Sequence, residues 1–354
     1  MSDSVQQKLQ ALYAGCGYQP FRVKKFERYE LYSENRRFLT TEKVLTFTNT
    51  DGRLMAMKPD VTLSIVQDTQ PEGLRKVFYR ENVYREQRPG EGFREIPQAG
   101  LECIGALDAV AVGEVVSLAA KSLLAISDTC VLNVSHIGVI SGVLEEAALD
   151  EAAQKAVFAA VGAKNVPALK TLCDAKTAAV LTALSDLHGP LQETLHLAEA
   201  LDLPESSRSA LEALRALSGQ LAAYGALPVC LDFSVVNDVE YYHDLVFRGF
   251  VQGAPTCVIS GGRYDRLLRR MGKQGGAIGF AVYLDRLEAV RSPRAEFDAD
   301  VLICYDTAAD APLAVQTAEA LRAKGETVRV ESDAPQGLRF RRTLRAEKGA
   351  VTEC

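Results

Sequence analysis

The sequence lacks the features that mark a secreted or membrane-spanning chain. Its longest apolar runs are shorter than the roughly 20 residues that a helix needs to cross a bilayer, so we expect no membrane association. Its first ten residues, MSDSVQQKLQ, have neither the basic start nor the apolar block of a secretory signal. These absences predict a cytoplasmic protein.

Metal centres and nucleic-acid binding also find little support in the composition. The eight cysteines are scattered and none pairs in the C-x-x-C spacing of zinc ribbons, while the four histidines show no ligand spacing. We therefore expect no metal site, and most of the cysteines to be small buried apolar residues. A formal net charge of −6 gives the whole chain no attraction for nucleic acid, although a local basic stripe is compatible with it.

What is present is the composition of an ordinary globular protein. With 354 residues, 47% of them hydrophobic and 24% charged, the chain is long enough for a full core and for two or three domains. Val5, Leu9, Leu12 and Tyr13 share one face at helical spacing. The first element is therefore predicted to be an amphipathic helix over residues 4–14.

Strand-like segments follow this helix. Asp51-Gly52 lies between two runs rich in aromatic and branched residues, which is a hairpin signal. Residues 74–86 and 92–105 read as two longer strands on either side of RPGEG, whose glycines mark a loop between antiparallel partners. A helix is predicted over residues 108–126.

The residue pattern changes twice more along the chain. Residues 131–225 are rich in Ala, Leu, Glu and Lys at helical intervals, which predicts a helical insertion. Strand signals return over residues 226–292, and we assign these, together with residues 1–130, to one core domain. After a linker, residues 298–354 begin with a strand, a helix and a strand, which predicts a partial α/β unit.

Five stretches, in order and spacing, resemble the class II aminoacyl-tRNA synthetases and in detail their histidyl branch. The resemblance implies an α+β fold with an antiparallel sheet flanked by helices. Any one of the stretches is weak evidence, but chance agreement of all is improbable. They are GYQPFRVKKFE at 17–27, MKPDVT at 57–62, FYRENVYREQRPGEGFREIPQAGLECIG at 78–105, EYYHDLVF at 240–247 and GGAIGFAVYLDRL at 275–287.

The resemblance also implies a histidine pocket. In that family the residues matching Asp60, Thr62 and Gln98 hold the α-amino and carboxylate groups, and those matching Glu102 and Tyr242 reach the imidazole. Tyr241, in the same segment, is included in the expected site. Charge-assisted hydrogen bonds of this kind contribute about 1.5–3 kcal/mol each, enough to orient a ligand. Gln98 and Glu102 are an even number of residues apart on a predicted strand, so both can face one cavity.

The catalytic side of the resemblance is less complete. Arg85 and Arg286 match the two arginines that bind ATP in the family, and we expect them to be remnants of that site. Gln87 stands where an acid contacts adenine, and Asn237 stands where histidyl enzymes have an arginine beside the α-phosphate. Losing one such transition-state donor costs about 10²–10³ in rate. We therefore expect no catalytic residues.

A histidine pocket without its catalytic arginine is similar to the regulatory subunits of ATP phosphoribosyltransferase. That resemblance implies a non-catalytic chain, without a cofactor, that activates a short-form catalytic subunit and confers feedback inhibition by histidine. It also implies self-association as a dimer and a hetero-octamer of four plus four chains. Residues 298–354 resemble only the first half of the family's anticodon-binding domain, which argues against tRNA as a partner. Two alternatives stay open. One is a divergent histidine–tRNA ligase that positions phosphate by another cation, such as Arg85, Arg263 or Arg286, and the other is a histidine sensor that acts on another target.

Overall fold

The computed structural model describes residues 2–39, 43–69, 73–86, 90–236, 241–288 and 297–354. The chain forms two compact units, residues 1–290 and residues 291–354. Unit 2 has a small apolar core of its own around Val301, Ile303 and Ala346.

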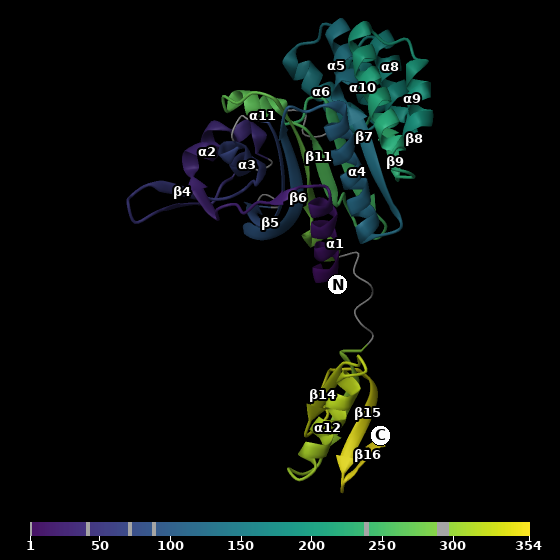
Figure 1. Ribbon diagram of the computed structural model, residues 1–354. Helices are drawn as coiled ribbons and strands as arrows, with labels where there is room; N and C mark the ends of the chain where they lie inside the picture. Colours follow the sequence, from purple (N-terminus) through teal and green to yellow (C-terminus); the bar gives the residue numbers. More distant parts are fainter. Residues whose placement is uncertain (1, 40–42, 70–72, 87–89, 237–240, 289–296) are drawn as a thin grey trace. The chain divides into compact units, whose positions relative to one another are not determined.

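Unit 1 is built on a mixed sheet to which nine strands of the described residues belong (Figure 1). Most neighbours in this sheet are antiparallel, but β1 with β5 and β7 with β9 are parallel. The expected α+β fold, a mostly antiparallel sheet flanked by helices, is thereby confirmed. In spatial order the strands are β1 (Gln19–Pro20), β5 (Leu74–Glu86), β6 (Phe93–Gly105), β12 (Gly276–Tyr283), β11 (Ile259–Arg263), β10 (Leu245–Val251), β7 (Cys130–His136), β9 (Val229–Asp232) and β8 (His188–Pro190).

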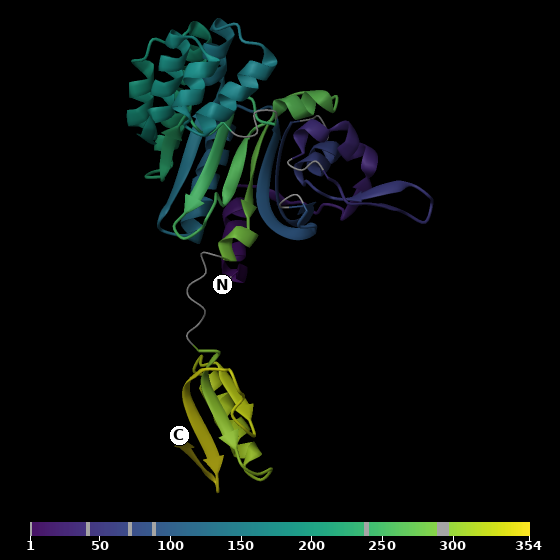
Figure 2. The same cartoon turned by 180° about the vertical axis from the view of Figure 1, so that it is seen from behind.

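Two helices, α1 (Ser2–Gly15) and α4 (Ala109–Ile126), pack on one face of this sheet (Figures 1 and 2). Asp108 caps α4, since its side chain accepts a hydrogen bond of 2.8 Å from the amide of Ala111. The 18 residues of α4 have a mean hydropathy of 1.8, enough to cross a membrane by length and composition. More than half of α4 is buried within unit 1, as in the core helix of a globular protein.

Smaller elements pack on the opposite face of the sheet. They have their own apolar cluster, to which Ile96 and Ile104 of β6 belong, whereas Leu101 and Cys103 of β6 face α1 and α4. Strand alternation therefore gives β6 two buried faces. The elements are β2 (Phe26–Arg28), α2 (Tyr29–Glu34), η1 (Arg36–Phe38), β3 (Thr46–Thr48), β4 (Leu54–Met57), α3 (Thr62–Asp68) and α11 (Asp265–Arg270). The short η2 (Asp285–Glu288) follows β12, and its Leu287 packs against the cluster that contains Leu101 and Cys103.

The hairpin predicted at Asp51-Gly52 joins β3 to β4. Gly52 has φ +78°, a left-handed conformation that glycine adopts without strain. The Asn49 side chain accepts hydrogen bonds of 3.0 and 2.8 Å from the amides of Asp51 and Arg53 and so closes the turn.

A helical layer follows β7, but it does not begin where the sequence suggested. We expected the helical insertion to start at residue 131, whereas residues 130–136 form β7, which pairs with β10 and β9 inside the main sheet. A short apolar run bounded by helices cannot be assigned by periodicity alone. The helices are α5 (Ile137–Glu146), α6 (Glu151–Gly162), α7 (Val166–Leu172), α8 (Ala175–Asp186), α9 (Leu191–Glu199) and α10 (Glu205–Ala222).

Unit 2 contains the expected strand, helix and strand, and the structure adds a C-terminal hairpin. Its described residues form a sheet in the order β14-β13-β15-β16, in which β13 pairs in parallel with both β14 and β15. The elements are β13 (Ala299–Tyr305), α12 (Ala311–Arg322), β14 (Val328–Glu331), β15 (Phe340–Glu347) and β16 (Ala350–Glu353).

Candidate functional site

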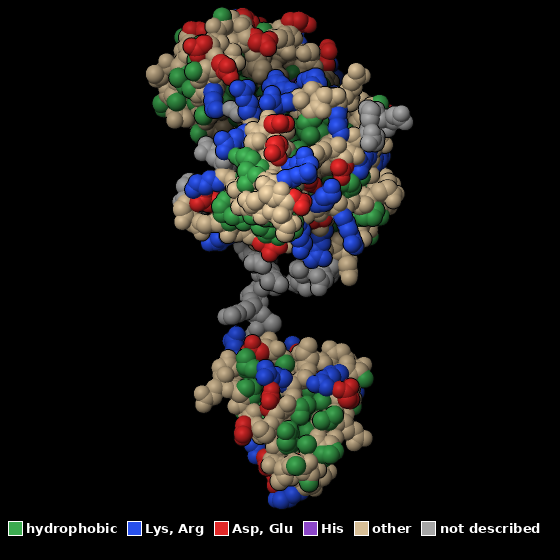
Figure 3. Space-filling view, turned by 90° about the vertical axis from the view of Figure 1, so that its left-hand side faces the viewer, with side chains coloured by type: hydrophobic (Ala, Val, Ile, Leu, Met, Phe, Trp, Pro, Cys, Tyr) green, Lys and Arg blue, Asp and Glu red, His purple; other side chains and the backbone are tan. Residues whose placement is uncertain are grey.

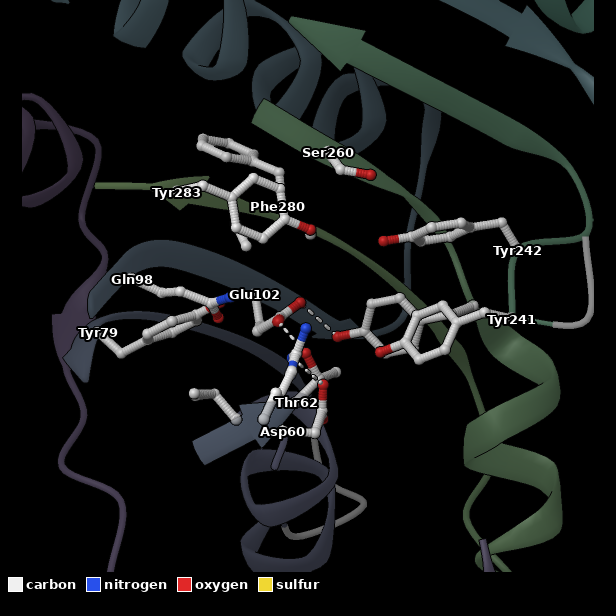
Figure 4. A pocket seen from close by; sticks show the side chains of 15 residues that line it. Asp60, Thr62, Tyr79, Gln98, Glu102, Tyr241, Tyr242, Ser260, Phe280 and Tyr283 are labelled. Carbon is white, nitrogen blue, oxygen red and sulfur yellow. Dashed lines mark hydrogen bonds and ion pairs between the residues drawn. The ribbon is translucent and has the colours of Figure 1, made fainter. Parts of the chain in front are cut away.

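A cavity opens on the face of the main sheet that carries the smaller elements. Together with the solvent at its mouth it has an empty volume of about 540 Å³, of which about 50 Å³ can hold the centre of a water molecule. All six residues expected to bind histidine line it. The lining is Asp60, Val61, Thr62, Tyr79, Arg85, Gln98, Glu102, Tyr241, Tyr242, Ser260, Tyr264, Gly279, Phe280, Ala281 and Tyr283 (Figure 4).

The segment MKPDVT supplies one side of the cavity. Asp60 Oδ1 accepts a hydrogen bond of 2.8 Å from the amide of Leu63, which caps the first turn of α3. Thr62, at the start of α3, donates a hydrogen bond of 2.7 Å from Oγ1 to Oε1 of Glu102. Behind this segment, Lys58 is 1% exposed and forms an ion pair with Glu81 of β5. The short segment is therefore fixed at both ends.

Strand β6 supplies the floor. Gln98 and Glu102 face the cavity and are 3% and 2% exposed. Tyr264 donates a second hydrogen bond, of 2.6 Å, to Oε2 of Glu102. The residue opposite Glu102 on β12 is Gly279, and a Cβ there would lie 1.7 Å from Oε2 of Glu102. A glycine at this register position is what makes room for the carboxylate.

Aromatic rings form the wall next to β11. The Tyr241 ring lies 4.7 Å from that of Tyr242 and 5.6 Å from that of Tyr264, and Phe38 of η1 packs behind it at 6.1 Å. Figure 4 shows Tyr241 and Tyr242 on one side of Glu102 and Tyr79 and Gln98 on the other. The cavity thus has polar groups at its centre and rings at its sides, as amino-acid pockets do.

Two buried carboxyl groups dominate the electrostatics. Burial raises the pKa of Glu102 to about 8, an effect that the hydrogen bonds from Tyr264 and Thr62 oppose and the nearby Asp60 adds to. Burial also raises the pKa of Asp60, against the lowering effect of Arg85. A ligand with a positive charge or N–H donors would stabilise the ionised forms of both carboxyl groups, whereas an anion would destabilise them.

Arg85 lines the cavity but is already engaged. Its Nη2 lies 3.6 Å from Oδ2 of Asp60, and its Nε donates to the carbonyl of Pro59. The second arginine expected at a vestigial ATP site, Arg286, is absent from the cavity lining. Its guanidinium stacks 3.9 Å from the ring centroid of Tyr283, and its Nη1 donates to the carbonyl of Cys257 at 2.6 Å.

Four polar lining residues were not foreseen from the sequence: Tyr79, Ser260, Tyr264 and Tyr283. Tyr79 reaches the cavity from β5, the hairpin partner of β6. The other three come from residues 260–283, which the pairing of β12 with β6 brings to the cavity. Tyr264 follows the glycine pair of GGRYD, and nothing local marks it as a partner of Glu102.

Two departures from the synthetase pattern, Asn237 and Gln87, lie outside the residues that the structure describes. The alternative cation Arg263 is absent from the cavity lining, and its Nη2 lies 2.9 Å from Oδ2 of Asp265. His243, Asp244 and Asp265 bring their ligand atoms within 4.8 Å of one another, a grouping that the spacing of the histidines did not predict. The Arg263 guanidinium lies near both carboxylates of this group and offsets one of their two negative charges.

One face of unit 1 is rich in Lys and Arg side chains (Figure 3). On the elements at this side, α11 carries Arg266, Arg269 and Arg270, all exposed. The net charge of −6 therefore conceals an uneven distribution of charge. Such a face favours contact with an acidic surface.

Comparisons with known proteins agree with this architecture. The family model described as histidyl-tRNA synthetase matches residues 2–287. A relative from Desulforamulus reducens, named ATP phosphoribosyltransferase regulatory subunit, is 30% identical over 323 residues, which is 85% of this chain and 79% of the relative.

Two solved structures share the fold. One, from Bacillus halodurans C, is titled as an ATP phosphoribosyltransferase regulatory subunit/histidyl-tRNA synthetase; it is 24% identical with a TM-score of 0.72, over 93% of this chain and 88% of that one. The other, an ATP phosphoribosyl transferase (HisG:HisZ) complex from Thermotoga maritima, is 19% identical with a TM-score of 0.63, over 80% and 97%. The chain belongs to the histidyl-tRNA synthetase family and, within it, to the ATP phosphoribosyltransferase regulatory subunits.

Proposed function

We propose that this chain is a non-catalytic subunit that activates a short-form ATP phosphoribosyltransferase and makes it sensitive to feedback inhibition by histidine. The catalytic partner transfers a phosphoribosyl group, and this chain supplies the sensor. The proposal places the complex in the cytoplasm, at the first step of histidine biosynthesis.

The observation that carries the proposal is the pair of buried carboxyl groups facing one small cavity. Asp60 and Glu102 are 8% and 2% exposed, and Arg85 is the cation among the described residues that line the cavity with them. Such a site favours a ligand that brings its own ammonium and N–H groups. Free histidine provides both.

In the proposed complex the histidine ligand lies in the cavity with each of its polar groups next to a lining residue. Its α-amino group contacts Asp60 and Thr62, and its carboxylate lies near Gln98 and Arg85. The imidazole reaches Glu102 and the hydroxyl of Tyr242, with the ring of Tyr241 beside it. Each polar group of histidine then has a partner, as buried polar groups require.

Regulation requires two states of the assembly with different affinities for histidine. In our proposal histidine favours the state in which the catalytic chain has low activity. The basic face on which α11 lies is available for contact with a partner chain, and nothing in the proposal needs tRNA.

We propose that the chain also associates with itself. Phe26 and Phe47 are 47% and 38% exposed and lie edge to face at 5.3 Å, and Leu54 beside them on the same small sheet is 42% exposed. An apolar group of this kind favours burial against a second copy. A dimer of this chain would form the centre of the proposed hetero-octamer of four plus four chains.

The decisive test is an activity assay with the short-form catalytic subunit from the same source. We expect phosphoribosyl transfer to require this chain and to fall when histidine is added. Full activity of the catalytic subunit alone, or no effect of histidine on the complex, would contradict the proposal.

The alternative of a divergent histidine–tRNA ligase retains support from the family model and from Arg85 in the cavity lining. Histidine-dependent exchange of pyrophosphate into ATP distinguishes the two functions. We expect none above background, because Arg85 is held by Asp60 and Arg286 stacks on Tyr283 outside the cavity lining. Measurable exchange would favour the ligase.

A further inference from the structure

Tyr283 forms the end of the cavity on the β12 side. It is the last residue of β12, where it pairs in register with Gln98 of β6, and its amide donates a hydrogen bond of 2.9 Å to the carbonyl of Val258. Figure 4 shows its side chain above Gln98 and Glu102, next to Phe280. The ring therefore closes the space above the floor of the cavity.

Arg286 fixes that ring from the other side. Its guanidinium carbon lies 3.9 Å from the ring centroid of Tyr283, well inside the roughly 6 Å range of a cation–π contact. The guanidinium is held in turn by the carbonyl of Cys257 at 2.6 Å and by its Sγ at 3.2 Å. Backbone pairing and this stack together hold Tyr283 in place.

The contact between Arg286 and Tyr283 also determines which charged side chains line the cavity. Arg286 does not line the cavity, and Arg85, which does, lies 3.6 Å from Asp60. Among the described residues, the groups nearest the centre are thus two carboxyls with one shared arginine. A triphosphate entering this space would meet buried carboxyl groups, and the one arginine among the described lining residues is already paired with Asp60.

We infer that Tyr283, held by Arg286, is a specificity-determining residue that ends the pocket after a single amino acid and excludes an adenosine phosphate joined to it. This inference rests on the proposed function, since it takes the amino acid to be histidine. The consequence is a sensor that reports free histidine independently of the ATP concentration.

The test is calorimetric titration of the full chain with three ligands: histidine, ATP, and the sulfamoyl analogue of histidyl adenylate. The wild-type chain is expected to bind histidine, to show no heat with ATP, and to bind the analogue more weakly than histidine. Tyr283→Ala opens a path to Arg286, and the affinity for the analogue relative to that for histidine should rise about tenfold, the scale of one desolvated cation–π contact.

Tyr283→Phe is the matched control, because it keeps the ring and its stack on Arg286 and should keep the exclusion. Arg286→Met removes the charge that holds the ring and should raise the same ratio by a smaller factor. The ratio of two dissociation constants is insensitive to partial loss of folded protein, which would lower the amount of both complexes alike.

The outcomes separate this inference from the function it rests on. Failure of the wild-type chain to bind histidine overturns the proposed function. Binding of histidine together with equally tight binding of ATP or the analogue overturns the role of Tyr283 alone. An unchanged ratio in both Tyr283→Ala and Arg286→Met, when either still binds histidine, overturns it as well.

Discussion

The hydroxyl of Tyr264 donates a hydrogen bond of 2.6 Å to Oε2 of Glu102, although 162 positions of sequence separate the two residues. With the bond from Thr62 to Oε1, it gives a buried carboxyl two donors from two different elements. This carboxyl is the group around which the cavity is arranged, and its charge state governs what the cavity can bind.

Glu102→Gln should weaken histidine binding by about 10- to 100-fold, the equivalent of one hydrogen bond to a charged group. The amide keeps the volume of the side chain but loses its charge and one acceptor. Glu95→Gln is the matched control, because Glu95 lies on the same strand and is exposed. Calorimetric titration measures both variants, and equal losses in the two would show that Glu102 does not contact the ligand.

Stability should depend on pH through the same residue. Its pKa is raised by burial to about 8, from an ordinary value of 4.5, so the folded chain keeps a proton that the unfolded chain releases. The contribution of Glu102 to the free energy of unfolding is therefore fully present below about pH 4.5 and falls as the pH rises to about 8. Denaturant unfolding measures the free energy of unfolding of the wild type and of Glu102→Gln. The difference between the two values should change between about pH 4.5 and pH 8 and stay constant at higher pH.

Histidine binding should release a proton near pH 7. The bound ligand favours the ionised form of Glu102, whose carboxyl is mostly protonated in the empty cavity at that pH. The measured binding enthalpy should then vary linearly with the ionisation enthalpy of the buffer, and Glu102→Gln should remove this dependence. A slope that persists in the variant would assign the proton to another group.

Much of this architecture could be predicted from the sequence, because its signals are local. The Asp51-Gly52 turn and the glycines before residue 93 each join neighbouring strands, and the resemblance to the synthetases placed Asp60 and Glu102 in one pocket. Tyr264 was not foreseen because its contact depends on β12 pairing between β6 and β11. Non-local pairing of this kind leaves no periodic trace in the chain.

Arg286 shows a different limit of prediction. Its position in the synthetase pattern was recognised, but position along the chain does not fix the direction of a long side chain. The stack on Tyr283 and the carbonyl of Cys257 set that direction, and they take the guanidinium away from the cavity. The sequence pattern thus located Arg286 along the chain, whereas side-chain packing determines where its guanidinium lies.

The buried ion pair of Lys58 and Glu81 should stabilise the segment MKPDVT at 57–62, which lines the cavity. Lys58 is 1% exposed, and Glu81 also accepts a hydrogen bond of 3.0 Å from the amide of Val23. Lys58→Met leaves Glu81 without its cation and should lower the free energy of unfolding by about 3 kcal/mol. The double variant with Glu81→Gln should recover much of this loss.

The pair of Lys76 and Glu114 provides the control for that experiment. These side chains are 26% and 19% exposed, so water screens their interaction more strongly. Lys76→Met should cost less than about 1 kcal/mol. Similar losses from Lys58→Met and Lys76→Met in urea unfolding would contradict a special role for the buried pair.

Gly279→Ala should abolish histidine binding and lower the free energy of unfolding. An added Cβ would lie 1.7 Å from Oε2 of Glu102 and 2.5 Å from the carbonyl oxygen of Leu101, so both the Glu102 side chain and the backbone of β6 must shift. Gly219→Ala in α10 is the control, since no atom lies within 4 Å of its Cβ and a helical alanine stabilises by about 0.5–1 kcal/mol. Thermal unfolding should give a cooperative transition for both variants, and calorimetry should find histidine bound only by the second. Wild-type affinity in Gly279→Ala would mean that the position of the Glu102 carboxylate does not determine binding.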